Sequence, residues 1–206
     1  MPFFVTGSFE YPWNRYLALV FEFPLKLAIP VTMLYIFRKL FCDDPCFFGV
    51  SLKNIKLRPY VFLLFFMIPL IVAASVQSDF LHVYPKVKNI DFISGYSHRP
   101  VLWKAFYEIS YGFDFISIEL FFRGFLVLSF VRLAGVDAIL PMAAFYCTVH
   151  FGKPIGECIS SYFGGIALGV IAYRTRSIVG GLILHLGIAY LMEIGGYLGN
   201  IYFNSR

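Results

Sequence analysis

The chain consists of long apolar runs separated by short polar stretches, a pattern typical of membrane-spanning helices. A bilayer core about 30 Å thick needs about 20 consecutive apolar residues in a helix. Runs that approach or exceed this length occupy residues 16–37, 59–78, 101–132, 136–150, 154–173 and 177–201. The sequence therefore predicts an all-α polytopic membrane bundle of about six transmembrane helices, with eight as the upper limit.

The third run and the polar stretches leave the finer organisation open. Residues 101–132 form either one long helix or two helices with a break near Gly112. Residues 38–58 and 77–100 are expected to be polar loops between helices. The whole chain, 1–206, is expected to be a single membrane domain, with N-terminal spans and loops over 1–100 and a core that carries the chemical motifs over 101–206.

Small residues punctuate the later runs. Gly152 suits the end of one helix, and Pro154 suits the first turn of the next. Small residues also recur four apart within two late runs, a spacing that lets helix backbones approach closely in lipid; these residues are Ser161, Gly165, Gly169, Gly195 and Gly199. The spacing predicts tight packing and says nothing about chemistry.

Composition strengthens the membrane interpretation and excludes several other classes. The chain is 59% hydrophobic, 20% aromatic and 14% charged, too apolar for a soluble domain of this length. Its net charge is +5, but the basic residues are scattered at the ends of apolar runs rather than gathered to follow phosphates. We therefore expect the lipid bilayer, and no nucleic acid, as a partner. The four cysteines (Cys42, Cys46, Cys147 and Cys158) match no common zinc spacing and imply no disulfide framework.

A few ionisable residues interrupt the apolar runs. Each costs at least roughly 2.5–3.5 kcal/mol in a span, so such residues are kept where they pair or work. Glu119 and Arg123 stand four apart and can form an ion pair on one helix face, either to lock helices together or to build a site. His150 and His185 are on later runs, at depths compatible with one shared cavity.

Three short motifs around these residues resemble those of the CAAX prenyl protease and bacteriocin-processing (CPBP) family. Residues 118–124 read Ile-Glu-Leu-Phe-Phe-Arg-Gly, similar to the family's Glu-Glu-x-x-x-Arg. Residues 146–150 end in His150, like Phe-x-x-x-His, with Tyr146 in the place of Phe. Residues 185–189 begin at His185, like His-x-x-x-Asn. The order and spacing match over residues 115–200, so the resemblance implies a membrane-embedded peptidase.

In that family the resemblance implies a glutamate-activated water, with the histidines and the asparagine stabilising the oxyanion. Two positions depart from the pattern: Ile118 replaces the first Glu, and Ala189 replaces the Asn. Position-by-position transfer supports Arg123, His150 and His185 and leaves the base vacant, since Glu119 matches the second Glu, whose implied role is to pair with the arginine.

Two carboxylates are alternatives for that base. Glu119 itself is favoured over Asp114, which lies one helical turn before Ile118 and points from nearly the same face. Glu193 ranks third, and Glu157 is expected to complement the dipole of its helix. A zinc ion held by Glu119, His150 and His185 is an open alternative that is not favoured, because the His-Glu-x-x-His spacing is missing.

The expected function is hydrolysis of a membrane-proximal or lipidated peptide by carboxylate-activated water with histidine oxyanion stabilisation. The alternative is a catalytically inactive relative that acts as a binding scaffold or immunity protein, because Ile118 and Ala189 damage two motifs. A small transporter ranks last, since no inverted repeat is visible. The expected location is the bacterial plasma (inner) membrane.

Overall fold

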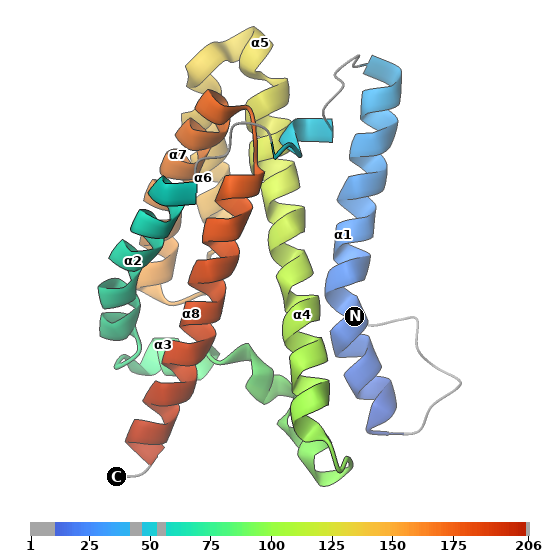
Figure 1. Ribbon diagram of the computed structural model, residues 1–206, viewed down its shortest axis with the longest axis vertical. Coiled ribbons are helices and arrows are strands. Elements are labelled where there is room, and N and C mark those ends of the chain that lie inside the picture. The colour runs from blue at the N-terminus through green and yellow to red at the C-terminus, as the bar shows by residue number, and fades with distance from the viewer. Residues whose placement is uncertain (1–10, 42–46, 53–56, 205–206) are drawn as a thin grey trace.

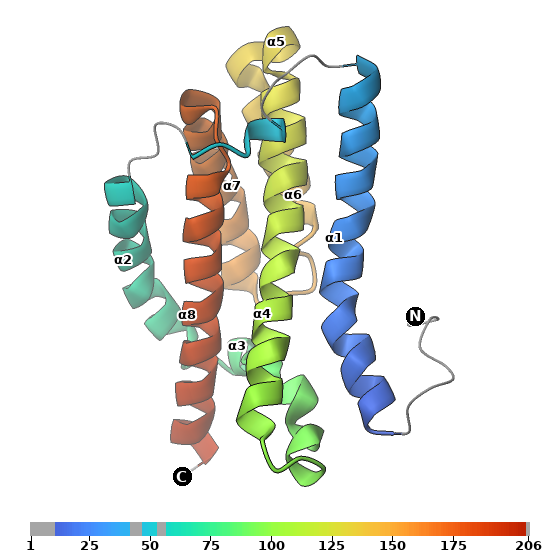
Figure 2. The same cartoon turned by 45° about the vertical axis from the view of Figure 1, so that its right-hand side comes forward.

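In a computed structural model the chain folds as a helical bundle, described over residues 11–41, 47–52 and 57–204 (Figures 1 and 2). Cys42 and Cys46 lie outside these residues. The regular elements of the described part are all helical: α1 (Trp13–Phe41), η1 (Phe47–Gly49), α2 (Leu57–Ala74), α3 (Ser78–Val83), η2 (Lys86–Gly95), α4 (Pro100–Glu119), η3 (Leu120–Ser129), α5 (Val131–Ala134), η4 (Gly135–Ala138), α6 (Ile139–Thr148), α7 (Ile155–Thr175) and α8 (Val179–Asn204). The predicted all-α membrane bundle is confirmed.

Within the described residues, four helices are long and apolar enough to cross a membrane: α1, α2, α7 and α8. The other two predicted spans are also helical but differ in kind. The run 136–150 forms the shorter apolar helix α6, preceded by η4. The run 101–132 forms α4 and η3, and α4 carries four charged side chains, Lys104, Glu108, Asp114 and Glu119. The chain is an integral membrane protein in which the charged helix α4 packs against the apolar helices α1 and α8.

The third run is one continuous helical segment, without a break at Gly112. A Cβ at Gly112 would lie 2.9 Å from the Tyr190 hydroxyl oxygen, so this glycine lets α8 approach α4 closely. The geometry changes further along, after Glu119, where the segment continues as the π-helix η3. π-Helical turns are frequent at functional sites because they re-aim side chains.

The predicted polar loop 77–100 is wrong in its interior, because it contains α3 and η2. Both lie toward the lower end of the bundle in Figure 1, with α3 beneath α2 and beside α8, and η2 beside the lower part of α4. Phe80 and Ile90 of this segment are buried against the helices. The segment therefore closes one end of the bundle rather than hanging free of it. We refer to residues 78–95 as the end cap.

Close helix packing follows the small residues. A Cβ at Gly165 would meet Ala143 at 3.3 Å, and one at Gly169 would meet Ile139 at 2.9 Å, so α7 lies directly on α6. A Cβ at Gly199 would meet Leu81 at 2.6 Å, which places α8 equally close to the end cap. The predicted role of these glycines in helix packing is confirmed.

Helices α4 and α8 run side by side through the middle of the molecule, between α1 and α2 at opposite edges, with α6 and α7 behind them (Figures 1 and 2). Glu119 lies at the end of α4, His185 on α8 and His150 in the turn after α6. The fold thus brings the three motif-bearing segments together from different parts of the sequence.

Candidate active site around Glu119 and His185

Glu119 is fully buried and makes two close contacts through one carboxylate oxygen. Its Oε1 lies 3.1 Å from Arg123 Nη1 and 3.1 Å from His185 Nδ1. The predicted ion pair between Glu119 and Arg123 is therefore present, with both side chains 0% exposed. A charge removed from water in this way is tolerated only when it is paired, and Arg123 supplies that partner for Glu119.

The second carboxylate oxygen of Glu119 is placed differently. Oε2 is buried and receives no hydrogen bond from the described residues. It faces the backbone of α8, where a Cβ on Gly181 would lie only 3.0 Å away. The absence of a side chain at Gly181 leaves Oε2 as an available acceptor within the protein interior.

His185 connects Glu119 to Tyr146. Because a carboxylate only accepts hydrogen bonds, the imidazole donates to Glu119 from Nδ1. Its Nε2 lies 3.1 Å from the Tyr146 hydroxyl, which donates to it when the imidazole is neutral. Arg123 also lies 4.2 Å from the centre of the Tyr146 ring, a cation–π arrangement. Arg123, Glu119, His185 and Tyr146 form one connected cluster, which we call the inner cluster.

His150 contacts Tyr146 rather than Glu119 within the described part of the chain. Its Nδ1 is 3.1 Å from the Tyr146 carbonyl oxygen, and the two rings are 4.7 Å apart. The structure thus brings Glu119, Arg123 and His185 into direct contact, whereas His150 is linked to them through Tyr146. Among the described residues, no three His, Cys, Asp or Glu side chains are grouped to hold a metal ion, so the three zinc ligands considered from the sequence are not assembled.

The other carboxylates considered from the sequence have different surroundings. Asp114 is half-buried on α4, and no ion pair or hydrogen bond joins it to either histidine within the described part of the chain. Glu193 accepts the backbone N–H groups of Lys86 and Val87, at 2.8 and 3.2 Å, and so anchors the end cap. Glu157 is in the first turn of α7, as its proposed effect on the helix dipole requires.

The two positions that depart from the motif pattern lie in apolar surroundings. Ile118 packs on the cluster of buried side chains between η3 and α6, which includes Phe122 and Tyr146. Ala189 is buried against Tyr111 and Phe115. Phe115 in turn lies edge-on to His185, at 4.8 Å between ring centres. Apolar side chains therefore border the inner cluster where the motif pattern has Glu and Asn.

Comparison with known families supports the motif interpretation. Residues 100–191 match the family model for type II CAAX prenyl endopeptidase Rce1-like proteins. Over this segment the chain is similar to the CAAX protease family. The match begins at the first residue of α4 and ends within α8, so it contains the whole inner cluster and His150. No curated protein and no solved structure matches the chain.

Sequence reasoning missed two features of this segment. The Tyr146 hydroxyl contacts His185, although the sequence indicated only a mild replacement of Phe. Glu157 faces His150, with 3.9 Å between Oε1 and Nε2. His150 and Glu157 are seven residues apart across a turn, and this spacing does not predict their contact. The contact depends on the angle between α6 and α7.

Proposed function

We propose that the protein is a membrane-embedded endopeptidase that hydrolyses a membrane-proximal or lipidated peptide with water activated by Glu119. The observation that supports this most is the unequal use of the carboxylate oxygens. Arg123 and His185 hold Oε1, whereas Oε2 is buried and accepts no hydrogen bond from the described residues. A fixed carboxylate with one available oxygen has the geometry of a general base.

In the proposed reaction, Oε2 accepts a proton from a water molecule as the water oxygen bonds to the carbonyl carbon of the scissile peptide. The carbonyl oxygen becomes an oxyanion. The tetrahedral intermediate then loses its nitrogen, and the proton held by Glu119 passes to the leaving amine. Glu119 ends the cycle as a carboxylate beside Arg123, as it began.

In this proposal, hydrogen-bond donors on and around Tyr146 stabilise the oxyanion. His185 has both ring nitrogens engaged, one with Glu119 and one with Tyr146. The Tyr146 O–H can turn from His185 toward a developing oxyanion, and protonated His185 can donate from Nε2. His150 is the second imidazole in reach of Tyr146. Donors fixed in a site that excludes water stabilise such charge far better than donors in water.

The substrate class follows from where the inner cluster lies. It is enclosed by helices whose outer faces are apolar, so a substrate enters from the bilayer or its surface. A peptide with a lipid attached, or one that emerges from the membrane, meets this requirement. The bacterial plasma membrane remains the proposed location.

The proposal is tested with purified protein in liposomes and a panel of lipidated and unmodified peptides, followed by mass spectrometry. Wild type cleaves at least one peptide, and Glu119→Ala and His150→Ala lose about 10²-fold or more in rate. Wild type that stays at the background of both variants over the whole panel would contradict the proposal.

An inactive, substrate-binding relative is the second candidate, and a specific observation favours it. Ile118 and Ala189, at the two degenerate motif positions, pack in apolar clusters beside the site. For an inactive protein, Ile118→Glu combined with Ala189→Asn would create cleavage where the native chain has none. Cleavage by the native chain would end this alternative.

A further inference from the structure

A second polar cluster surrounds His150 in the turn after α6. It consists of His150, Lys153, Glu157 and Tyr84, which we call the outer cluster. The side chains of His150 and Glu157 are 7% and 13% exposed, so solvent screens their interaction only slightly. Nothing in the three sequence motifs requires this cluster, and it contains only one of their residues.

The contacts of His150 fix the roles of its two nitrogens. A backbone carbonyl only accepts hydrogen bonds, so the 3.1 Å contact with Tyr146 O requires a hydrogen on Nδ1. In the neutral imidazole Nε2 then carries a lone pair. This nitrogen faces Glu157 Oε1 at 3.9 Å, which is an electrostatic contact rather than a hydrogen bond. A negative charge at that distance stabilises the imidazolium that forms when Nε2 accepts a proton.

Glu157 is itself held in place by two donors. The Tyr84 hydroxyl donates to Oε2 at 3.0 Å, and Lys153 Nζ lies 2.7 Å from Oε1. Burial raises the pKa of Tyr84 well above its ordinary value, so the phenol keeps its proton and remains a donor. Tyr84 joins α3 to η2, and its contact reaches the first turn of α7 from a distant part of the sequence. The end cap therefore fixes the carboxylate that faces His150.

We propose that Glu157 is a positioning residue for His150: held by Tyr84 and Lys153, it compensates the charge of the imidazole when Nε2 takes up a proton and orients the imidazolium that forms. As with the aspartate of a Ser-His-Asp triad, a fixed carboxylate stabilises the imidazolium. Here, however, the Tyr146 carbonyl oxygen accepts the Nδ1 hydrogen, and the carboxylate faces Nε2. The catalytic use of His150 rests on the proposed peptidase function, but the effect of Glu157 on its proton does not.

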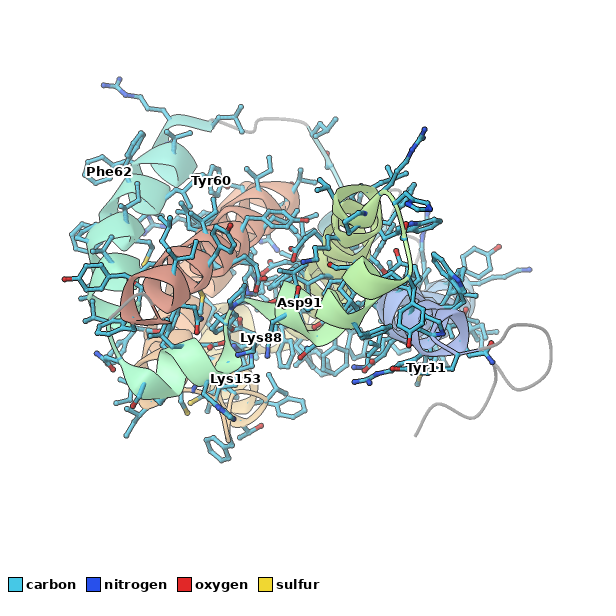
Figure 3. The ribbon with its side chains drawn as sticks, turned by 90° about the horizontal axis from the view of Figure 1, so that it is seen from below. Tyr11, Tyr60, Phe62, Lys88, Asp91 and Lys153 are labelled. Atoms are coloured by element: carbon cyan, nitrogen blue, oxygen red, sulfur yellow. The ribbon has the colours of Figure 1, made fainter. Side chains whose placement is uncertain are left out.

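Other charged and titratable groups also face His150. Lys153 lies on the same turn and opposes the imidazolium, although its ammonium is paired with Glu157. His185 faces it from α8, and Tyr146 packs on it from α6. Lys153 belongs to the end of the bundle viewed in Figure 3. Among these charged groups, Glu157 is the one whose charge favours the imidazolium.

The first measurement is an NMR titration of protein with ¹⁵N-labelled histidine in detergent micelles, with His150→Gln used to assign the signal among the four histidines. Glu157→Gln moves proton uptake by His150 about one pH unit lower, and Glu157→Asp restores most of it. The matched control is Glu22→Gln, which removes another carboxylate from an i,i+4 pair with lysine, exposed on α1. An unchanged His150 titration in Glu157→Gln would overturn the proposal, whatever the protein's activity.

The second measurement uses the peptide cleaved by wild type. Glu157→Gln lowers kcat about tenfold with KM within about twofold, and Glu157→Asp recovers most of the loss. Adding Glu157→Gln to His150→Gln causes no further loss, because the glutamate acts through the histidine. Additive losses, or a loss confined to KM, would overturn the positioning role. An NMR shift without cleavage of any peptide by wild type would instead count against the peptidase function and leave the Glu157–His150 interaction standing.

Discussion

At the scale of single residues, the buried pair of Glu119 and Arg123 determines what the inner cluster can do. Each charge alone would be costly in the interior of a membrane protein, and each is tolerable because the other lies 3.1 Å away. The pairing also orients the carboxylate, since the same oxygen that meets Arg123 meets His185. Stability and the proposed chemistry therefore depend on the same contact.

Arg123→Met leaves the Glu119 charge buried without its partner. Removing one member of a buried pair costs about 3–5 kcal/mol of unfolding free energy, so we expect a much lower thermal unfolding midpoint in detergent. Lys26→Met, which breaks the exposed pair with Glu22, serves as the control and costs less than about 1 kcal/mol. Equal midpoints for the two variants would show that the buried pair is not ionised.

Gly181→Ala tests the space beside Glu119 Oε2. The added Cβ would lie 3.0 Å from that oxygen and occupy the position from which a water reaches it. We expect at least about tenfold slower peptide cleavage with little change in thermal stability. At Gly164 a Cβ meets no atom within 4 Å, so Gly164→Ala is the matched control and keeps full activity. Full activity in Gly181→Ala would argue against water activation at Oε2.

At the scale of elements, the sequence predicts the helices better than the segments between them. Long apolar runs dictate where the spans occur, because only a helix satisfies the backbone in lipid. The end cap was missed because its polar sequence gives no periodic signal, and its helices are stabilised by burial of Phe80 and Ile90 against the bundle. The π-helix η3 was also missed, since the sequence of residues 120–129 is compatible with an ordinary helix.

The candidate site likewise contains contacts that the sequence predicts and contacts that depend on tertiary packing. Motif spacing predicts that Glu119 and Arg123 share one helix face and that His185 comes near them, and in the structure Arg123 and His185 both contact Glu119. The contacts of His150 with Glu157 and of Glu157 with Tyr84 depend on how a short turn and the end cap pack on α7. Such long-range contacts are set by tertiary packing rather than by spacing in the sequence.

Gly196→Ala tests the docking of the end cap on α8. A Cβ there would lie 2.6 Å from backbone and side-chain atoms of Tyr84, so the end cap would have to move. We expect a lower unfolding midpoint and, because Tyr84 then releases Glu157, slower cleavage. Gly95→Ala, within the end cap but with no atom within 4 Å of the added Cβ, is the control. If both variants behave like wild type, Tyr84 does not hold Glu157 through this contact.

At the scale of the whole molecule, apolar helices surround a small polar interior. Helices α1, α2, α7 and α8 supply the lipid-facing surface, and α4 brings the charged residues inside. The family match covers residues 100–191, less than half of the chain, whereas α1, α2 and the end cap lie before it. We propose that all 206 residues form one membrane domain, with the first hundred enclosing the motif-bearing core.

This architecture predicts that the protein resists extraction from membranes without detergent. Alkaline carbonate releases peripheral proteins. It does not extract a protein with several apolar helices in lipid, because exposing those helices to water costs too much free energy. The protein is therefore expected to remain in the membrane pellet and to dissolve only when detergent is added, as judged by immunoblotting. Release by carbonate alone would contradict the assignment of these helices as membrane spans.

The central claim is that Glu119 is the base that activates water. Its most direct test is the rate of cleavage of one peptide in liposomes by Glu119→Gln and by Asp114→Asn, each removing one carboxylate charge from the same helix. The account predicts that Glu119→Gln loses about 10²-fold or more in kcat, while Asp114→Asn stays within about threefold of wild type. Near-normal cleavage by Glu119→Gln, or a greater loss in Asp114→Asn, would contradict it.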